Sequence, residues 1–421
     1  MTFPRILTGY LDRWIRRPKS LLLWGPRQVG KTTLIENWLE KGLPRGWESH
    51  AYPLQDPSVR RRMEQEPGIL QEELLAGTGK RKVIFIDEVQ KVPALLDLVQ
   101  LLIDRHKSKW KFILTGSSAR KIRRAGANLL PGRVFEKRLD PLMWSELGWP
   151  HPSPGRSLTP LPWPKMRKAG EAGRKTPRFG LEDQMTWGSL PEMPALGAAD
   201  RSETLKSYVS LYIEQEIRAE ALARNLGAFN RFLELAARES GSAPNLSKLA
   251  QESGVSMPAI KGYYAILEDT FLVERLEPYL KNARKRLMAP PRHFFFDTGV
   301  RNAAAGLPLT RDILAVESGR RFEHHIILET LRRIRSMDLP WKVHYWRTSH
   351  GAEVDMVVDT GDELVPIEIK HSTHVSRSDL SGLHQFMEDY RSKVRQGWLV
   401  CRIPKPRKLA RQITAIPWQM L

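Results

Sequence analysis

A short glycine-containing loop between an apolar run and a helical pattern constrains the fold of this chain most strongly. The apolar run covers residues 21–24, and the loop after it reads Gly25-Pro-Arg-Gln-Val-Gly-Lys-Thr32. This matches the pattern G-x-x-x-x-G-K-[ST] in full, and helical spacing follows over residues 31–39. A strand, this loop and a helix in that order indicate a parallel sheet with crossover helices.

Each residue type in the loop has a chemical task in this interpretation. Gly25 and Gly30 let backbone N–H groups converge on phosphates, Lys31 reaches the β and γ phosphates of ATP, and Thr32 ligates Mg²⁺. We therefore expect ATP and Mg²⁺ as cofactors, and a nucleotide site made of Gly25, Pro26, Arg27, Gln28, Val29, Gly30, Lys31, Thr32 and Thr33. The alternative is a chance match in a glycine-containing turn.

A second motif supports the first, because two carboxylates follow another apolar run. Residues 83–86 are apolar and precede Asp87 and Glu88. Asp87 at the end of a strand can hold the magnesium shell, and Glu88 can act as general base toward the attacking water. The pair could instead cap the next helix. After a third predicted strand, Thr115, Ser117 and Ser118 are candidates to sense the γ phosphate, Ser117 foremost, or are turn formers.

The length of 421 residues predicts more than one domain. We expect a parallel-sheet domain over residues 1–148, a linker or insertion rich in proline and basic residues over 149–195, a helical domain over 196–285, and a third α/β domain over 286–421. Within the helical domain, residues 246–257 read as a helix, a glycine turn and a second helix capped by Ser256. This resembles a winged helix, and the scarcity of cations on its second helix favours a structural role.

The third domain carries a second group of acidic residues. Asp355 begins one predicted strand, and Glu368 and Lys370 share a face of the next because residues two apart on a strand point the same way. Two carboxylates can bind a divalent cation, and a lysine can orient or deprotonate a water. The arrangement resembles that of restriction-endonuclease-like nucleases, and the resemblance makes Glu323 on a preceding helix an additional metal ligand. Glu and Lys on an exposed strand face are the alternative.

The N-terminal motifs together resemble those of AAA-type ATPases of the AAA+ superfamily, P-loop NTPases, in a prokaryotic group with a C-terminal domain of unknown function. The resemblance rests on residues 25–33, 85–90, 114–118 and 132–146. It makes Arg133 a candidate phosphate-contacting or trans-acting arginine. Competing candidates, or simply parts of a basic loop, are Arg120, Arg123, Arg124 and Arg138.

The amino-acid composition indicates which partners the chain binds and in which compartment it works. Lys and Arg number 67 against 47 Asp and Glu, so a formal charge of +20 favours a polyanion, DNA more than RNA. The single cysteine, Cys401, excludes an intramolecular disulfide and indicates a reducing, cytoplasmic setting. No apolar run approaches the ~20 residues that cross a bilayer. A trans-acting arginine would need a homo-oligomer.

Three functions remain open at this stage. The first is an ATPase that couples hydrolysis to a nuclease-like domain that contacts nucleic acid, with or without cleaving it. The second is a signalling or defence ATPase that uses the C-terminal fold as a protein-interaction module. The third, a metabolite kinase, leaves the helical and nuclease-like regions without a task.

Overall fold

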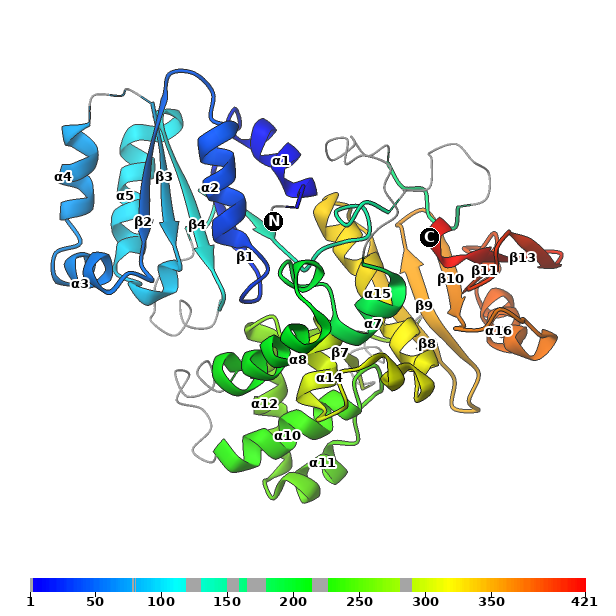
Figure 1. Ribbon diagram of the computed structural model, residues 1–421. Coiled ribbons are helices and arrows are strands. Elements are labelled where there is room, and N and C mark those ends of the chain that lie inside the picture. Colours follow the sequence, from blue (N-terminus) through cyan, green and yellow to red (C-terminus); the bar gives the residue numbers. More distant parts are fainter. Residues whose placement is uncertain are drawn as a thin grey trace. The chain divides into compact units, whose positions relative to one another are not determined.

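The computed structural model describes residues 3–77, 79, 81–118, 130–149, 159–164, 179–213, 226–280 and 290–421. The chain forms two compact units (Figure 1). The N-terminal unit comprises Thr2–Pro141 and the short segment Asp269–Leu272, and the C-terminal unit comprises Leu142–Glu268 and Val273–Leu421.

A five-stranded parallel sheet organises the N-terminal unit, in the order β2-β3-β4-β1-β5. The prediction of a parallel α/β sheet is thereby confirmed. Its strands are β1 (Ser20–Trp24), β2 (Trp47–Pro53), β3 (Arg81–Asp87), β4 (Trp110–Gly116) and β5 (Val134–Arg138). Because β4 lies between β1 and β3, the end of β4 stands between the glycine loop and the acidic pair.

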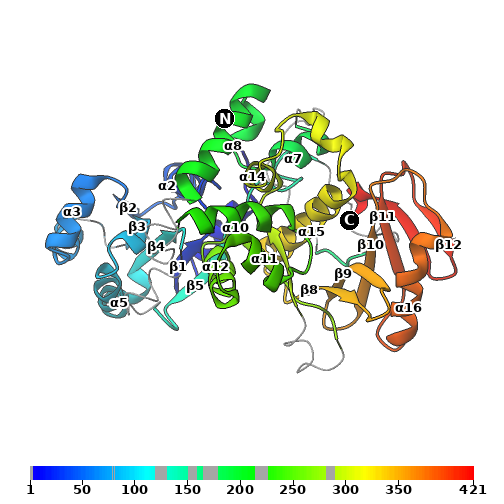
Figure 2. The same ribbon diagram turned by 90° about the horizontal axis from the view of Figure 1, so that it is seen from below.

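Helices cover both faces of this sheet (Figure 2). Leu95, Val99 and Leu102 of α5 pack in one core with Leu22 and Ile84 of the strands. On the other face α1 and α2 meet, with the rings of Trp14 and Trp38 6.0 Å apart. The helices are α1 (Ile6–Trp14), α2 (Lys31–Lys41), α3 (Pro57–Gln65), α4 (Ile69–Ala76) and α5 (Leu95–His106), with the short turns η1 (Val89–Lys91) and η2 (Lys107–Lys109).

The first part of the C-terminal unit is helical, as expected. The predicted helix, turn and helix are present as α11 and α12, with Gly254 in the left-handed region (φ 70°) and the Ser256 hydroxyl accepting the Ala259 N–H at 3.4 Å. An antiparallel pair, β6 (Val273–Leu276) and β7 (Arg292–Phe295), follows. The helical elements are α7 (Leu181–Trp187), α8 (Ala198–Ser207), η4 (Tyr208–Ile213), α10 (Leu226–Arg238), α11 (Leu246–Ser253), α12 (Met257–Asp269) and α14 (Thr298–Ala304).

The end of the predicted linker differs from the expectation. Residues 181–187 form α7, a helix that is almost entirely buried although it contains Asp183 and Gln184. Its polar groups find partners inside the unit, because the Asn302 side chain donates to the carbonyls of Met185 and Thr186 at 3.0 Å each. The helix could not be predicted from hydrophobic periodicity, because it has no apolar stripe. Its polar groups can be buried because they form hydrogen bonds.

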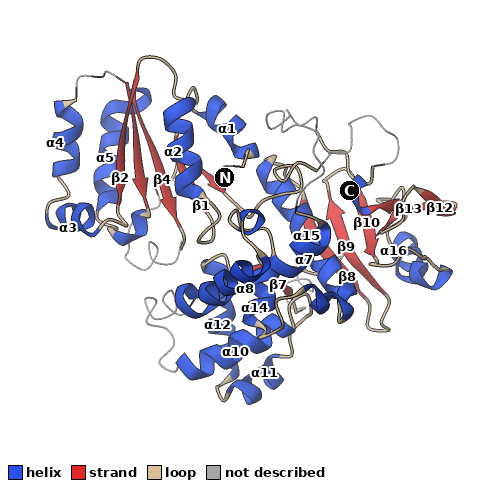
Figure 3. Ribbon diagram, viewed as in Figure 1, coloured by secondary structure: helices blue, strands red, loops and turns tan. Residues whose placement is uncertain are grey.

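A six-stranded mixed sheet forms the second part of the C-terminal unit, in the order β12-β13-β11-β10-β9-β8 (Figure 3). Phe322, Ile326 and Ile327 of α15 pack on one face of it, and Leu383 and Phe386 of α16 belong to a separate core on the other. Its elements are η5 (Arg311–Ala315), α15 (Ser318–Ser336), β8 (Lys342–Arg347), β9 (Glu353–Asp359), β10 (Leu364–Ile369), η6 (Arg377–Leu380), α16 (Ser381–Asp389), β11 (Gly397–Cys401), β12 (Arg407–Ala410), β13 (Ile413–Pro417) and η7 (Trp418–Met420).

Strand direction changes inside this sheet. β8, β9 and β10 are antiparallel neighbours, whereas β10, β11 and β13 run parallel. The two strands predicted to carry Asp355 and Glu368 are present as β9 and β10. Within the described residues, no helix combines the length and the apolar character needed to cross a membrane.

Candidate functional site

Backbone conformation shapes the glycine loop between β1 and α2. Gly25 has φ 152° and Gly30 has φ 87°, and Gln28 also lies in the left-handed region at φ 60°. A Cβ atom on Gly25 would stand 2.3 Å from the Leu139 carbonyl oxygen. The glycines are therefore required both by the turn and by its close backing. Arg5 supports the same loop by donating to the Val29 carbonyl at 2.9 Å.

The Lys31 ammonium lies inside this loop. Lys31 is buried, and its Nζ donates to the carbonyl oxygens of Gly25 and Pro26 at 2.9 Å each. The same Nζ stands 3.8 Å from Oε1 of Glu88. A cation at the start of a helix, ringed by loop backbone, is suited to binding terminal phosphates. Val29 in the loop is fully buried, and Thr33, two positions after Lys31, is exposed.

Thr32 and Asp87 meet, although 55 positions separate them. The Thr32 hydroxyl donates to Oδ2 of Asp87 at 2.9 Å. Asp87 is also held by the Thr115 hydroxyl and, at 3.4 Å, by Nε2 of Gln55. Hydroxyl and carboxylate oxygens are the ligands that Mg²⁺ prefers. The two residues expected to share a magnesium ion are thus adjacent.

Glu88 is fixed by its neighbours rather than left to solvent. Its backbone is left-handed (φ 57°), its N–H is accepted by the Thr115 hydroxyl at 3.0 Å, and its carboxylate accepts from Ser117 at 2.9 Å and from Gln90. Burial raises the pKa of Glu88, but the Lys31 charge and these hydrogen bonds, with the Arg27 charge, outweigh it and keep the pKa below the usual value. The side chain is therefore an ionised base.

Arg133 lies at the other end of the strands. It precedes β5, whose first residue Val134 pairs with Ser20 at the start of β1, whereas the glycine loop follows Trp24 at the end of β1. Its guanidinium forms two 2.8 Å hydrogen bonds with the Asp104 carboxylate of α5. The structure therefore does not bring Arg133 to the glycine loop of its own chain, and its trans-acting role stays a prediction.

The competing arginines divide into two groups. Arg138 ends β5 beside Trp24, on the edge that carries the glycine loop, with its Nε 3.0 Å from the Asp140 carboxylate. Arg120, Arg123 and Arg124 lie outside the described residues.

The C-terminal carboxylates gather where β9 and β10 separate. The last paired residues are Ile367 and Met356, so Glu368 and Asp355 stand opposite each other one step further. There Oδ2 of Asp355 accepts the Ile369 N–H at 2.8 Å, replacing a ladder bond. The Lys370 ammonium donates to Glu368 at 2.7 Å. Lys370 thus lies beside the acidic pair, as the spacing indicated.

Glu323 of α15 completes the group. Its Oε1 is 3.3 Å from Arg292, which also pairs with Glu353. Burial raises the pKa of Glu323, of Asp355 and of Glu368, the last to about 8, and repulsion among these carboxylates adds to the effect. Such a crowded acidic cluster favours protons or a divalent cation. We refer to Glu323, Asp355 and Glu368 as the carboxylate cluster.

Two cations hold this cluster in its present arrangement. Arg292 and Lys370 occupy oxygens of Glu323 and Glu368, whereas Oε2 of Glu368 is buried without a hydrogen-bond partner. Among the described residues, no three His, Cys, Asp or Glu side chains stand ready to hold a metal ion. The donor types suit a divalent cation, so a metal would require Arg292 or Lys370 to move.

Three segments of the chain match models of known protein families. Residues 17–148 match the family model of an AAA domain. The N-terminal unit carries an AAA-type ATPase domain. Residues 178–311 and 318–421 match two families described as domains of unknown function, DUF8612 and DUF4143.

Two curated proteins are similar to most of this chain. An uncharacterized protein of Mycobacterium tuberculosis is 25% identical over 375 residues, which cover 89% of this chain and 75% of that protein. An uncharacterized protein of Haemophilus influenzae is 22% identical over 307 residues, covering 70% and 69%. A solved DNA polymerase III gamma subunit-related protein of Thermotoga maritima aligns over 78% of this chain and 99% of that chain, at 11% identity and a TM-score of 0.24.

Some residues of the AAA domain site escaped sequence reasoning. Ser117, expected to sense the γ phosphate, donates to the Glu88 carboxylate at 2.9 Å, a contact that was not anticipated. Gln90 and Gln55 were not anticipated, and only Gln90 has a signal in the sequence, its position two residues after Glu88. In the C-terminal unit, Glu353 lies two residues before Asp355 and shares that strand, whereas nothing in the sequence marks Arg292.

Proposed function

We propose that the chain is a Mg²⁺-dependent ATPase whose C-terminal unit contacts DNA and cleaves it at the carboxylate cluster. The observation that carries the ATPase part is the meeting of Lys31 and Thr32 with Asp87 and Glu88 in one place. The loop, helix start, hydroxyl and two carboxylates fit a Mg-nucleotide in chemistry and in order.

The residues divide the catalytic work. Lys31 and the backbone N–H groups of the loop bind the phosphates, and Thr32 and Asp87 hold the metal ion. Mg²⁺, when bound, neutralises charge on the phosphate oxygens. Glu88, ionised and aimed by Ser117 and Gln90, accepts a proton from the attacking water.

Two variants test the ATPase. Lys31→Ala should lose nucleotide binding and turnover, whereas Glu88→Gln should keep nucleotide binding and lose about 10²–10⁴-fold in kcat, the usual worth of a general base. Nucleotide binding by fluorescence and phosphate release measure the two effects separately. Full turnover by Lys31→Ala would disprove the assignment of this site.

The nuclease part depends on the charge arrangement of the carboxylate cluster. Glu323, Asp355 and Glu368 would hold a divalent cation, and such a cation activates a water and polarises a phosphodiester. Lys370 supplies a positive charge beside Glu368, where it can orient that water. The order helix, three antiparallel strands, helix and parallel strand supports a restriction-endonuclease-like fold for this part.

Plasmid nicking in Mg²⁺ or Mn²⁺ tests this part. Asp355→Asn and Glu368→Gln should each abolish nicking. Asp362→Asn is the matched control, since Asp362 is exposed in the turn of the same hairpin and should leave activity unchanged. Equal nicking by all four proteins would assign the activity to a contaminant.

The neutralisation of the carboxylate cluster by two cations favours a second candidate function. Because Arg292 and Lys370 neutralise the carboxylate cluster, the C-terminal fold can serve as a protein-interaction module of a signalling or defence ATPase without cleaving DNA. Under the main proposal, DNA changes the ATPase rate of the parent chain. A rate that is identical with and without DNA favours the second function.

A further inference from the structure

A polar cavity of about 250 Å³ opens next to the carboxylate cluster. Three arginines line it, Arg292, Arg320 and Arg347, against two carboxylates, Glu323 and Glu353. Glu323 belongs to both the cavity wall and the carboxylate cluster. A molecule bound in the cavity therefore extends directly to the proposed cleavage centre.

Two of the three arginines have hydrogen-bonding capacity to spare. Arg320 is 61% exposed and its nearest carboxylate contact, to Glu317, is 3.5 Å long; Arg347 is 59% exposed and stands 3.6 Å from Glu353. Contacts of this length and exposure contribute little to stability. The guanidinium groups of Arg320 and Arg347 thus have N–H donors directed to solvent at the cavity, whereas Arg292 is buried between Glu323 and Glu353.

The remaining wall is a turn, residues 240–243, fixed against β7. The Gly241 N–H donates to the His293 carbonyl at 2.8 Å, and the Ser240 hydroxyl accepts the Phe295 N–H at 3.0 Å. Gly241 has φ 93°, and a Cβ there would stand 3.2 Å from the Phe294 ring. The turn is therefore rigid, and it brings small residues rather than bulky ones to the cavity, which leaves room for a phosphate.

We propose that this cavity binds a phosphodiester group of a DNA strand, with Arg320 and Arg347 as its two donors. The inference rests on the proposed function, because it concerns the substrate of the same cluster. Guanidinium groups bind phosphate oxygens through paired hydrogen bonds, so two arginines that line one cavity can hold one backbone phosphate. The phosphate in the cavity fixes the strand so that the neighbouring phosphodiester passes Glu323.

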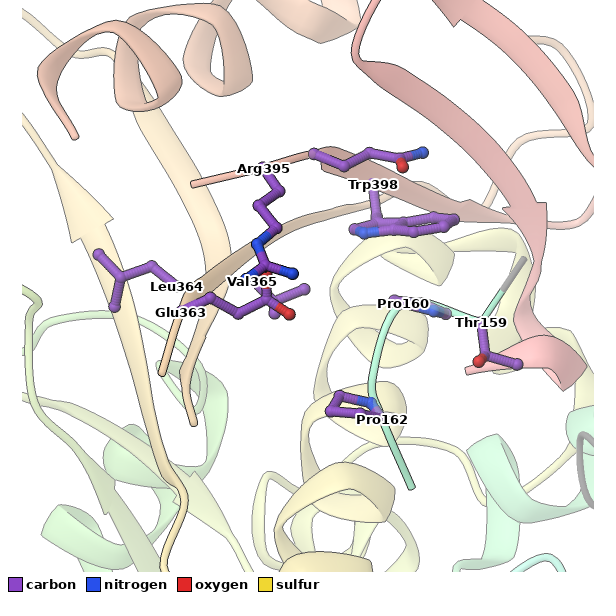
Figure 4. A pocket seen from close by; sticks show the side chains of 9 residues that line it. Thr159, Pro160, Pro162, Glu363, Leu364, Val365, Arg395 and Trp398 are labelled. Carbon is purple, nitrogen blue, oxygen red and sulfur yellow. The ribbon is translucent and has the colours of Figure 1, made fainter. Parts of the chain in front are cut away.

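Other cavities of the C-terminal unit do not fit this ligand. A cavity of about 310 Å³ between Pro160, Pro162, Val365 and Trp398 carries a balanced pair, with Arg395 3.5 Å from Glu363 (Figure 4). A cavity of about 530 Å³ is lined by four arginines, Arg238, Arg301, Arg320 and Arg321. Backbone carbonyls of Ala237 and Val316 and the Glu317 carboxylate engage Arg301 and Arg321, Arg238 pairs with Glu234 at 2.9 Å, and Arg320 borders this cavity as well as the first. Neither cavity contains Arg347 or a residue of the carboxylate cluster, so neither can hold a phosphate beside the proposed cleavage centre.

DNA binding in EDTA tests the cavity without any cleavage. A fluorescent DNA oligonucleotide is titrated with the full chain and with Arg320→Ala and Arg347→Ala, and each variant should bind about tenfold more weakly, the worth of a hydrogen bond to a charged group. The salt dependence of log K should also become shallower by about one for each variant. Ser242→Glu, which places a carboxylate in the cavity, should weaken binding at least as much.

Arg391→Ala is the matched control. Arg391 is 75% exposed and pairs with Glu388 three residues earlier, just as Arg320 pairs with Glu317, but it lies at the end of α16 away from the cavity residues. It removes the same charge and should change affinity less than twofold. Thermal midpoints should be equal for the three arginine variants, because the replaced side chains are exposed.

The outcomes separate the two proposals. If the parent binds DNA and Arg320→Ala, Arg347→Ala and Ser242→Glu bind like Arg391→Ala, the phosphate subsite is disproved while the proposed function stands. If the parent does not bind DNA at any salt concentration, DNA contact and the subsite both fail. Tighter binding of RNA of the same sequence, with the same loss in the variants, would overturn the choice of DNA.

Discussion

Burial decides the chemistry of two neighbouring histidines on α15. His324 places Nε2 2.7 Å from the Phe295 carbonyl and so donates, whereas Nε2 of His325 accepts from the Trp144 indole at 2.8 Å. The two rings are thus neutral in opposite tautomers. Burial lowers the pKa of each to about 3. Both serve packing, and neither is presented to the carboxylate cluster as a ligand.

These histidines predict acid sensitivity of the C-terminal unit. Unfolded histidine has a pKa near 6.5, so between pH 6.5 and about 3 the unfolded chain binds protons that the folded unit refuses. Stability is complete above pH 6.5 and falls as pH drops, by about 1.4 kcal/mol per pH unit for each histidine. Urea unfolding between pH 7.5 and 5 measures the slope.

His325→Phe separates this titration from general acid effects. The variant keeps an aromatic ring but removes one titrating group, so its stability should fall less steeply with acid. It leaves the Trp144 N–H unpaired, which costs about 1–3 kcal/mol at neutral pH. His350→Phe, on an exposed turn, is the control and should leave the slope unchanged. Equal slopes for His325→Phe and the parent would contradict the assignment.

Replacing Thr115 should lower kcat, because Thr115 positions the two acidic residues of the ATP site. Its hydroxyl donates to Asp87 and accepts the Glu88 N–H, so it positions both acids. Thr115→Val keeps the shape and should lower kcat about tenfold or more, with nucleotide affinity changed only slightly. Thr115→Ser should restore kcat. A rise in KM with an unchanged kcat would show that Thr115 acts on binding instead.

At the scale of elements, two helical glycines predict opposite effects. A Cβ on Gly382 of α16 would lie 1.8 Å from the Glu353 carbonyl of β9, whereas a Cβ on Gly319 of α15 meets nothing within 4 Å. Gly382→Ala must push α16 off the sheet, a cost of about 1–3 kcal/mol. Gly319→Ala should stabilise by about 0.5–1 kcal/mol, because glycine is a poor helix former. The urea unfolding midpoints of both variants and the parent measure these effects. Equal midpoints for the two variants would contradict the close packing of α16 against β9.

Elements with a buried apolar run were predictable, and exposed ones were not. β1, β3 and β4 are buried along most of their length and stood out in the sequence. β2 and β5 are half-exposed edge strands with charged residues, so they carry no apolar run. Edge strands owe their position to a neighbour's hydrogen bonds rather than to their own pattern.

The same physics separates predictable from unpredictable site residues. The glycine loop and the acidic pair are contiguous motifs, so each could be identified locally. The residues that hold these side chains in place come from distant segments of the chain. Asp87 is held by Thr115 and Gln55, and Glu323 of the carboxylate cluster is held by Arg292. A long-range contact of this kind leaves no periodicity, so geometry alone reveals it.

For the whole molecule, the parallel sheet separates Arg133 from the glycine loop. In a parallel sheet all strands begin at one end of the sheet and finish at the other. Arg133 lies at the end where the strands begin, directly before β5. A guanidinium at that end of the sheet lies away from the glycine loop of its own chain, so the predicted catalytic role of Arg133 requires the γ phosphate of a neighbouring copy. Turnover per chain should therefore rise with protein concentration.

Mixing two inactive variants tests this directly. Arg133→Ala keeps a complete glycine loop and Lys31→Ala keeps the arginine, so a mixed oligomer contains loops that receive Arg133 from the neighbour. The mixture should hydrolyse ATP faster than the sum of its parts, because an arginine supplied in trans is worth about 10³–10⁵ in rate. The double variant mixed with Lys31→Ala is the control and should stay inactive. A mixture no faster than Arg133→Ala alone would leave the Arg133–Asp104 pair as a structural ion pair at the edge of the sheet.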